Sequence, residues 1–253
     1  INLRLRLEDM PANTVEDVER QEKLLKEAND KIVRLRCAAD LLVAAEFWGE
    51  NAKDKLERVR HAAVVLDRYI ENGSTEEFEQ IAAKERRGQP MFHWPLEFPE
   101  VIVKRGGFDA FVGNPPFMGG KKITGHLGDA CREYLVTHLA AGSRGHADLC
   151  AYFFLRGKQT IRHEGHFGLL ATNTIAQGDT REVGLDQLCN NGCIIYRAIS
   201  SRPWPGVASL EVAHVWIRRG TWKGLFTLND KREDGITCLL TPLWVIPIVL
   251  QQS

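Results

Sequence analysis

A short apolar run that ends in two consecutive prolines constrains this chain more than any other feature. Residues 108–117 read "FDAFVGNPPF". The apolar residues at 108–112 predict a short buried strand. Proline has no N–H for a sheet ladder, so the strand must end where the prolines begin. The pattern therefore predicts a strand followed by a stiff loop at its carboxyl end.

The segments after this loop alternate between helical and strand patterns. Residues 147–163 predict a helix and residues 166–173 a second buried strand. Residues 193–200 and 208–220 predict two more strands, which form an antiparallel pair at an edge. Strand, helix, strand with apolar strands is typical of a parallel sheet. We therefore predict an α/β fold for residues 91–225.

The N-terminal part of the chain has a different periodicity. Residues 1–12 alternate apolar and charged side chains, which predicts a strand remnant. Residues 13–90 predict a helical hairpin followed by one shorter helix, with a break at Gly49. Apolar residues at intervals of seven, three and four form a seam along each hairpin helix. The two seams consist of Val18, Leu25, Ala28, Ile32, Leu35, Ala39 and Leu42, and of Leu56, Val59, Ala63, Leu66 and Ile70.

Two of these helices carry sequence signals for their first turns. Asn13 is the expected N-cap of the first long helix, with Glu16 completing a capping box. Ser74 with Glu77 is expected to cap the third helix. Acidic residues in the first turn favour the same starting points, because they interact well with the positive end of the helix dipole.

Composition excludes little. The 33 basic and 33 acidic residues balance, so any nucleic-acid binding must depend on local basic patches. The six cysteines are irregularly spaced, which favours reduced thiols in the cytoplasm over a disulfide framework, and Cys189 with Cys193 lacks the second pair of a zinc site. Residues 226–253 form a C-terminal tail whose apolar part, 238–250, is too short to cross a membrane. We expect no metal and no membrane partner.

The residues of the proline loop could form a simple turn, since Asn and Pro are common turn residues, but they also suit one kind of chemistry. Pro115 offers a carbonyl oxygen without an N–H, and Asn114 adds a side-chain oxygen beside it. Two acceptors on a stiff loop match a donor with two hydrogens, such as an exocyclic amino group. Phe117 supplies a flat apolar face for a heterocyclic base. Such a site would hold a weakly nucleophilic amine for attack on an electrophile such as the methyl group of S-adenosylmethionine.

These residues also resemble a known family. The loop "FDAFVGNPPF", the segment "GHADLCAYFFLRGKQTIRHEGHFGLLATNTIAQGDTR" and the segment "SRPWPGVASLEVAHVWIRRG" resemble adenine-specific DNA methylases of type II restriction-modification systems. The resemblance implies a Rossmann-like methyltransferase sheet at residues 91–225, with residues 13–90 as an insertion. It implies S-adenosylmethionine as cofactor and double-stranded DNA with a flipped adenine as partner. It assigns the catalytic site to Asn114, Pro115, Pro116 and Phe117.

Other residues are weaker candidates. Asp148 and Asn173 could line the cofactor or target pocket, although Asp148 could equally be a solvated acid at a helix start and Asn173 a simple strand end. Charged runs are more often solvated surface, and a tryptophan in a turn is more often packed. These residues could therefore have no contact with DNA. The candidates for DNA contact are Lys121, Lys122, Arg202 and Trp204, and the candidates for phosphate contact are Lys84, Arg86 and Arg87.

One expected element is missing. A methyltransferase of this kind needs a glycine-rich turn after its first strand, and no glycine occurs before Gly49. We therefore expect a truncated part of a larger enzyme, completed by upstream and target-recognition segments. Two alternatives remain open: a methyltransferase acting on guanine N2 in RNA or on glutamine in proteins, and a non-catalytic remnant that binds DNA or a partner.

Overall fold

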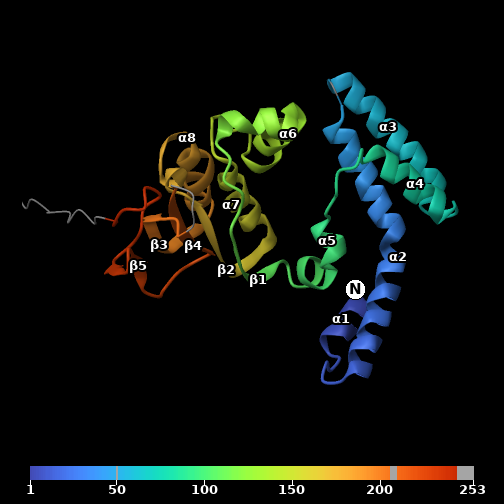
Figure 1. Cartoon of the computed structure of the whole chain (residues 1–253), viewed down its shortest axis with the longest axis horizontal. Helices are drawn as coiled ribbons and strands as arrows, with labels where there is room; N and C mark the ends of the chain where they lie inside the picture. Colours follow the sequence, from blue (N-terminus) through green and yellow to red (C-terminus); the bar gives the residue numbers. More distant parts are fainter. Residues whose placement is uncertain (50, 206–209, 244–253) are drawn as a thin grey trace, which may run out of the picture. The chain divides into compact units, whose positions relative to one another are not determined.

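The chain folds into two compact units. The computed structural model describes residues 1–49, 51–205 and 210–243 (Figure 1). The first unit is helical and comprises residues 1–106, and the second starts at Gly107. Residues 91–106 therefore group with the helices, whereas the sequence pattern placed the domain boundary between residues 90 and 91.

The first unit consists of helices only in its described part. The predicted strand at residues 1–12 is wrong, because residues 2–8 are helical. Leu3 and Leu7 are four residues apart and so share a helix face, and Arg4 donates from Nη2 to Oδ1 of Asn29 at 3.0 Å. The elements are α1 (Asn2–Glu8), α2 (Val15–Phe47), α3 (Ala52–Tyr69), α4 (Thr75–Glu85), α5 (Trp94–Glu97) and the π-helix η1 (Glu100–Lys104).

The helix starts follow capping chemistry with one shift in position. The N-cap of α2 is Thr14 and not Asn13: Thr14 Oγ1 accepts from the Asp17 N–H at 3.1 Å, and Asp17 Oδ2 accepts from the Thr14 N–H at 3.1 Å. This reciprocal pair is the capping box, displaced by one residue from the expected one. Ser74 caps α4 as predicted, accepting from the Glu77 N–H at 3.3 Å.

The helical core overlaps the predicted apolar seams only in part. Ala28 of the first seam is buried, and Leu66 and Ile70 of the second seam pack against the core. Among the other seam residues, Val18, Leu35 and Leu42 of α2 are exposed, as are Leu56 and Val59 of α3. The buried cluster consists of Cys37, Ala38, Leu41, Ala62, Val65, Tyr69, Phe78 and Ala82.

Phe78 should anchor this helical core. Its side chain is fully buried and stacks on Tyr69 with 5.7 Å between ring centroids. We expect Phe78→Ala to lower the free energy of unfolding of this unit by about 3–5 kcal/mol. Val64→Ala, at a side chain that is 69% exposed, is the control and should change it by less than about 0.5 kcal/mol. Urea unfolding monitored by circular dichroism would measure both, and equal effects would contradict this account of the core.

The second unit contains a mixed six-stranded sheet, which confirms the α/β prediction. The strand order is β1-β2-β4-β3-β5-β6. β1 is parallel to β2 and β3 is parallel to β5, whereas β4 is antiparallel to both β2 and β3. The strands are β1 (Phe108–Gly113), β2 (Ile161–Thr172), β3 (Cys193–Pro203), β4 (Glu211–Arg219), β5 (Phe226–Leu228) and β6 (Lys231–Glu233).

Two details of the sheet differ from the sequence predictions. β1 was expected to be buried, but within the described residues it pairs on one side only. Phe111 packs against the core, whereas the next side chain, Val112, points to the opposite face and is 81% exposed. The antiparallel pair β3 and β4 was expected at an edge, but β5 and β6 extend the sheet beyond it. Part of the predicted tail, residues 226–233, therefore belongs to the sheet, whereas residues 244–253 lie outside the described residues.

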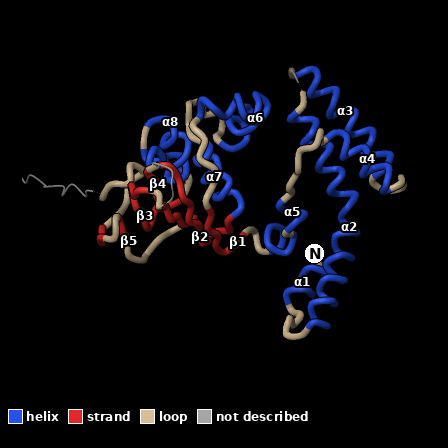
Figure 2. Tube along the Cα trace, viewed as in Figure 1, coloured by secondary structure: helices blue, strands red, loops and turns tan. Residues whose placement is uncertain are grey.

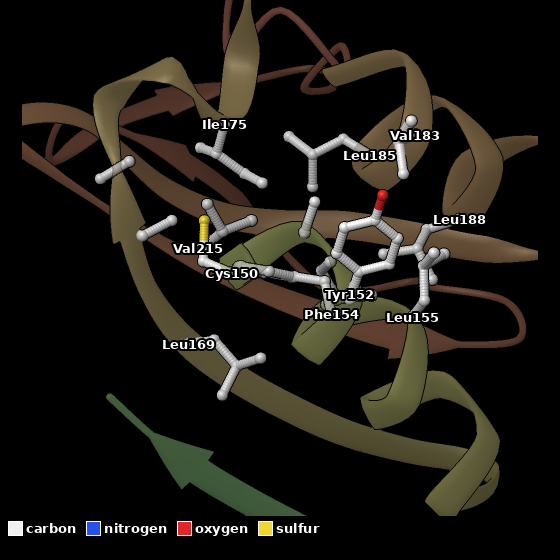
Figure 3. Close-up of a cluster of buried hydrophobic side chains, with 14 of the residues drawn as sticks. Cys150, Tyr152, Phe154, Leu155, Leu169, Ile175, Val183, Leu185, Leu188 and Val215 are labelled. Atoms are coloured by element: carbon white, nitrogen blue, oxygen red, sulfur yellow. The ribbon is translucent and has the colours of Figure 1, made fainter. Parts of the chain in front are cut away.

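Helices cover one face of this sheet and bury the main core (Figures 2 and 3). Tyr152 and Phe154 of α7 pack among Leu169, Val215 and Leu188 from the strands and the following helices. The helical elements of this unit are α6 (Gly120–Tyr134), η2 (Leu135–Leu139), α7 (Leu149–Thr160), η3 (Asn173–Ala176), α8 (Gly178–Arg181), η4 (Glu182–Asp186) and α9 (Gln187–Asn190).

In β2 a partly buried histidine accepts a hydrogen bond from an arginine. His166 lies opposite Arg218 in the β2–β4 register, and Arg218 Nη1 donates to His166 Nε2 at 2.7 Å. Burial lowers the pKa of His166 below its usual 6.5, and the nearby Arg162 charge lowers it further. The neutral ring is the form that accepts this bond, so protonation would remove the acceptor and bring two cations together.

The low pKa of His166 predicts a pH-dependent stability. As the pH falls below about 6.5, the unfolded chain takes up this proton before the folded chain does, so the free energy of unfolding decreases. His166→Gln keeps an acceptor oxygen that does not titrate, and should reduce the loss of stability between pH 7 and pH 5. His163→Gln, at a side chain that is 75% exposed on the same strand, is the control. Urea unfolding at several pH values would measure this, and a wild-type profile in His166→Gln would contradict it.

Three general findings bear on function. In the part of the chain that the structure describes, no helix is both long and apolar enough to span a membrane. The described residues also contain no cluster of three or more side chains arranged to bind a metal ion. All six cysteines are free thiols in the structure.

Candidate functional site

Parallel pairing brings two candidate segments to the same edge of the sheet. Gly113 at the end of β1 is in register with Leu169 of β2, and both strands run in the same direction. Asn114 follows β1, and Asn173 follows β2 at the start of η3. The carboxyl edge of a sheet is where α/β proteins bind ligands. The structure therefore places the predicted loop in a position suited to binding.

The proline loop is anchored at one residue and open at its neighbours. Pro115 is buried, whereas Asn114 and Pro116 are exposed and Phe117 is half-buried. Within the described part of the chain, the side chain of Asn114 makes no hydrogen bond. The amide oxygen of Asn114 is thus available as an acceptor. The next residue, Pro115, is restricted by its proline ring and by its burial.

Phe117 lies beside a second aromatic residue from a distant part of the sequence. Its ring is 6.4 Å from that of Trp204, at an interplanar angle of 89°. Trp204 is half-exposed and directly follows β3. Its backbone N–H donates to the Leu210 carbonyl at 2.8 Å. The two aromatic candidates named from the sequence therefore belong to one cluster, although a large part of the catalytic segment separates them in the chain.

The backbone after Phe117 is held against the start of α7. The Met118 N–H donates to Asp148 Oδ1 at 3.3 Å, and the Met118 carbonyl accepts from the Leu149 N–H at 2.8 Å. Asp148 is only 6% exposed and caps α7, accepting from the Cys150 N–H at 3.0 Å. The solvated position considered for Asp148 is therefore wrong, since this acid connects the loop to the helix.

A buried thiol lies near the same acid. Burial and the Asp148 carboxylate both raise the pKa of Cys150. A thiol that stays protonated is disfavoured as a nucleophile. Thr172 shares a hydrogen bond with Thr174, with 2.7 Å between the hydroxyl oxygens.

The basic candidates differ in their surroundings. Lys121 and Lys122 are exposed in the first turn of α6, close in sequence to the loop, and no ion pair involves them within the described residues. Arg202 is in strand β3 itself and not in a loop, and its Nη2 lies 3.5 Å from Asp230 Oδ2. Lysines at this position can contact phosphates, whereas Arg202 already has a partner.

In the helical unit, two of the three basic candidates have partners. Arg86 forms an ion pair with Asp40, with 3.5 Å between Nε and Oδ2. The guanidinium carbon of Arg87 lies 5.2 Å from the centre of the Trp48 ring. Lys84 is exposed. Both arginines thus have a structural role within this unit, which weakens their assignment to phosphate binding.

The described residues do not by themselves fit S-adenosylmethionine. Neither β1 nor β2 ends in a glycine-rich turn that would let the backbone approach an adenosyl group. The Asp148 carboxylate is buried, and its Oδ1 already accepts two backbone hydrogen bonds, which weakens its assignment to cofactor binding. Asn173 is half-buried at the sheet edge and remains the better placed of the two cofactor candidates.

The structure adds residues that the sequence reading did not single out. Met118 and Gly120 fix the exit of the loop, and Thr180 accepts the Asp148 N–H at 3.1 Å. Asp179 accepts the N–H of His146 next to this point. The adjacent glycines Gly119 and Gly120, directly after Met118, were the sequence signal for this contact, because adjacent glycines often mark a close backbone approach.

Gly120 should be intolerant of a side chain. A Cβ atom there would overlap the backbone of His146 and Ala147, which cannot yield as a flexible side chain could. We expect Gly120→Ala to destabilise this unit by about 1–3 kcal/mol. Gly125→Ala lies in the same helix with open space around its Cβ, and should stabilise by about 0.5–1 kcal/mol. Thermal unfolding of both variants would measure this, and equal shifts of Tm would contradict the proposed contact.

A protein-family model matches most of this chain. The family model of the Eco57I restriction-modification methylase matches residues 16–196, which is more than half of the chain. Comparison with curated protein sequences gave no match. A solved structure of the type IIL restriction-modification enzyme MmeI in complex with DNA is similar at 19% identity and a TM-score of 0.44. The match covers 53% of this chain but 19% of that enzyme, and at this level of likeness it adds nothing to the assignment.

Proposed function

Because this chain belongs to the Eco57I restriction-modification methylase family, we propose that it forms the amine-binding part of a DNA methyltransferase. The substrate is the N6 amino group of adenine, and the methyl donor is S-adenosylmethionine. The single observation that carries the proposal is the exposed Asn114 side chain at the carboxyl edge of the sheet, next to buried Pro115 and half-buried Phe117.

The proposed role of the loop is to activate a poor nucleophile. The lone pair of the adenine amine is delocalised into the ring. Hydrogen bonds from its two N–H groups to Asn114 Oδ1 and to the Pro115 carbonyl favour a more tetrahedral nitrogen, which frees the lone pair. A loop that is fixed before the substrate arrives supplies this arrangement without reorganisation in the transition state.

Phe117 and Trp204 support the choice of a base as substrate. A base inside a duplex cannot present its amine to an enzyme, so it must leave the stack. Aromatic side chains compensate for the lost base stacking by about 1–3 kcal/mol for each base. The perpendicular arrangement of the two rings offers a face and an edge, against which a flat heterocycle can be held.

Lys121 and Lys122 support DNA as the carrier of that base. They begin α6 directly after the loop, so phosphates flanking an extruded nucleotide would lie within their reach. Salt-dependent binding is expected from such contacts. The equal numbers of acidic and basic residues in the whole chain do not oppose this, because the contact is local.

S-Adenosylmethionine supplies an electrophilic methyl group when it is bound. Since the described residues do not form its cradle, we propose that further segments of the same enzyme complete the donor site. This chain's own contribution is then to hold the amine, shield the base from water and fix the direction of attack.

Removing the Asn114 oxygen should abolish most of the transfer. We expect Asn114→Ala to lower the rate of methyl transfer to DNA by roughly 10²-fold or more, the usual effect of losing one preorganised polar partner, while Tm stays unchanged. Asn190→Ala is the control, because Asn190 is likewise an exposed asparagine but lies in α9. The measurement is incorporation of labelled methyl groups from S-adenosylmethionine by the enzyme that contains this chain together with its donor-binding segments, followed by nucleoside analysis of the DNA.

The outcomes separate the competing functions. N6-methyladenine as product, lost in Asn114→Ala, agrees with the proposal. Undiminished transfer by Asn114→Ala would remove this residue from the mechanism. Label found in guanine N2 of RNA or in glutamine side chains would replace DNA adenine as substrate. An enzyme that contains this chain together with its donor-binding segments and modifies none of the three would point to a non-catalytic remnant.

A further inference from the structure

Asp148 connects two features that the proposed function leaves separate, the loop that holds the amine and the start of α7. We infer that Asp148 is a positioning residue, whose carboxylate fixes the exit of the Asn-Pro-Pro-Phe loop and thereby the orientation of Asn114 and Phe117. This inference rests on the proposed function for its catalytic consequence. The contact itself is independent of that function.

The Met118 backbone is fixed at both of its polar groups. Its N–H donates to Asp148 Oδ1 at 3.3 Å, and its carbonyl accepts from the Leu149 N–H at 2.8 Å. Met118 directly follows Phe117 and is four residues beyond Asn114. Because two prolines stiffen the loop between them, fixing its exit also restricts the direction of the residues before it.

Asp148 is itself held from the opposite side. Its own N–H donates to Thr180 Oγ1 at 3.1 Å, and its side chain is buried between the loop and the helix start. The Asp148 carboxylate also accepts from the Cys150 N–H at 3.0 Å in the first turn of α7. The acid therefore connects the loop to two other segments, α7 and α8.

Capping of α7 alone does not account for this arrangement. An N-cap needs one acceptor for a first-turn N–H, and Asp148 Oδ1 supplies it to Cys150 at 3.0 Å. The bond from Met118 reaches the same oxygen from thirty residues earlier in the sequence and has no part in the helix. The two roles can be separated by the length of the side chain.

Serine is the variant that separates them. Its hydroxyl oxygen is a good N-cap acceptor but stops one bond short of the position of a carboxylate oxygen. Asp148→Ser should therefore keep α7 capped and release Met118. Asp148→Asn has an acceptor oxygen at the same distance from the backbone and should restore both contacts. Thr160→Ala, at the other end of α7, is the control for a general weakening of this helix, because Thr160 Oγ1 donates to Gly157 within it.

The test combines a structural and a kinetic measurement. Amide hydrogen exchange at Met118 should accelerate in Asp148→Ser but not in Asp148→Asn or Thr160→Ala. With S-adenosylmethionine and DNA, kcat for Asp148→Ser should fall on the order of 10²-fold, as expected when a reacting group is displaced by about 1 Å, while KM for DNA stays near the wild-type value. Asp148→Asn should recover most of kcat.

Several results would overturn the inference. Unchanged Met118 exchange in Asp148→Ser would show that the carboxylate does not fix the loop. Accelerated exchange with full kcat would show that the contact has no role in positioning. An equal loss of kcat in Thr160→Ala would assign the effect to the helix as a whole. If the enzyme that contains this chain together with its donor-binding segments transfers no methyl groups, the proposed function fails, and the exchange data alone still decide whether Asp148 holds the loop.

Discussion

The parallel pairing of β1 with β2 is the constraint on which the rest of the site depends. It brings the carboxyl end of each strand to one edge of the sheet, where the loop at 114–117 and η3 both begin. Two prolines then prevent the chain from continuing in the sheet, and the backbone must turn outward there. Everything proposed about function follows from this rigid exit of the chain at a sheet edge, where a ligand has access.

The loop is held at its exit and accessible at its start. At the exit, the Met118 backbone is hydrogen-bonded to Asp148 and Leu149, and the Asp148 N–H donates to Thr180. Within the loop, Asn114 is exposed and Phe117 contacts Trp204. A polar group that is rigid before its ligand binds needs no reorganisation in the reaction, which is the main source of electrostatic catalysis. A loop that is held at its exit and has an exposed Asn114 thus gives a physical reason for amine activation.

Local signals in the sequence predicted much of this, and non-local ones were missed. The loop, the helix α7 and the cap at Ser74 depend on neighbouring residues, so their patterns could be read directly, whereas the helix α6 that directly follows the loop was not predicted. The contact of Phe117 with Trp204 could not, because it depends on how β3 and β4 enter the sheet. The edge position of β1 and the helix at residues 2–8 were also missed, since an apolar alternation does not say whether a partner strand exists.

The most direct test of the central claim is a crystal structure of this chain with a DNA duplex. If the loop binds the target amine, the structure should show an extrahelical adenine against Phe117 and Trp204. Its amino nitrogen should lie about 2.7–3.2 Å from Asn114 Oδ1 and from the Pro115 carbonyl oxygen. A duplex bound with all bases stacked, or a base held away from this loop, would contradict the claim that the prolines and the asparagine form an amine-binding site.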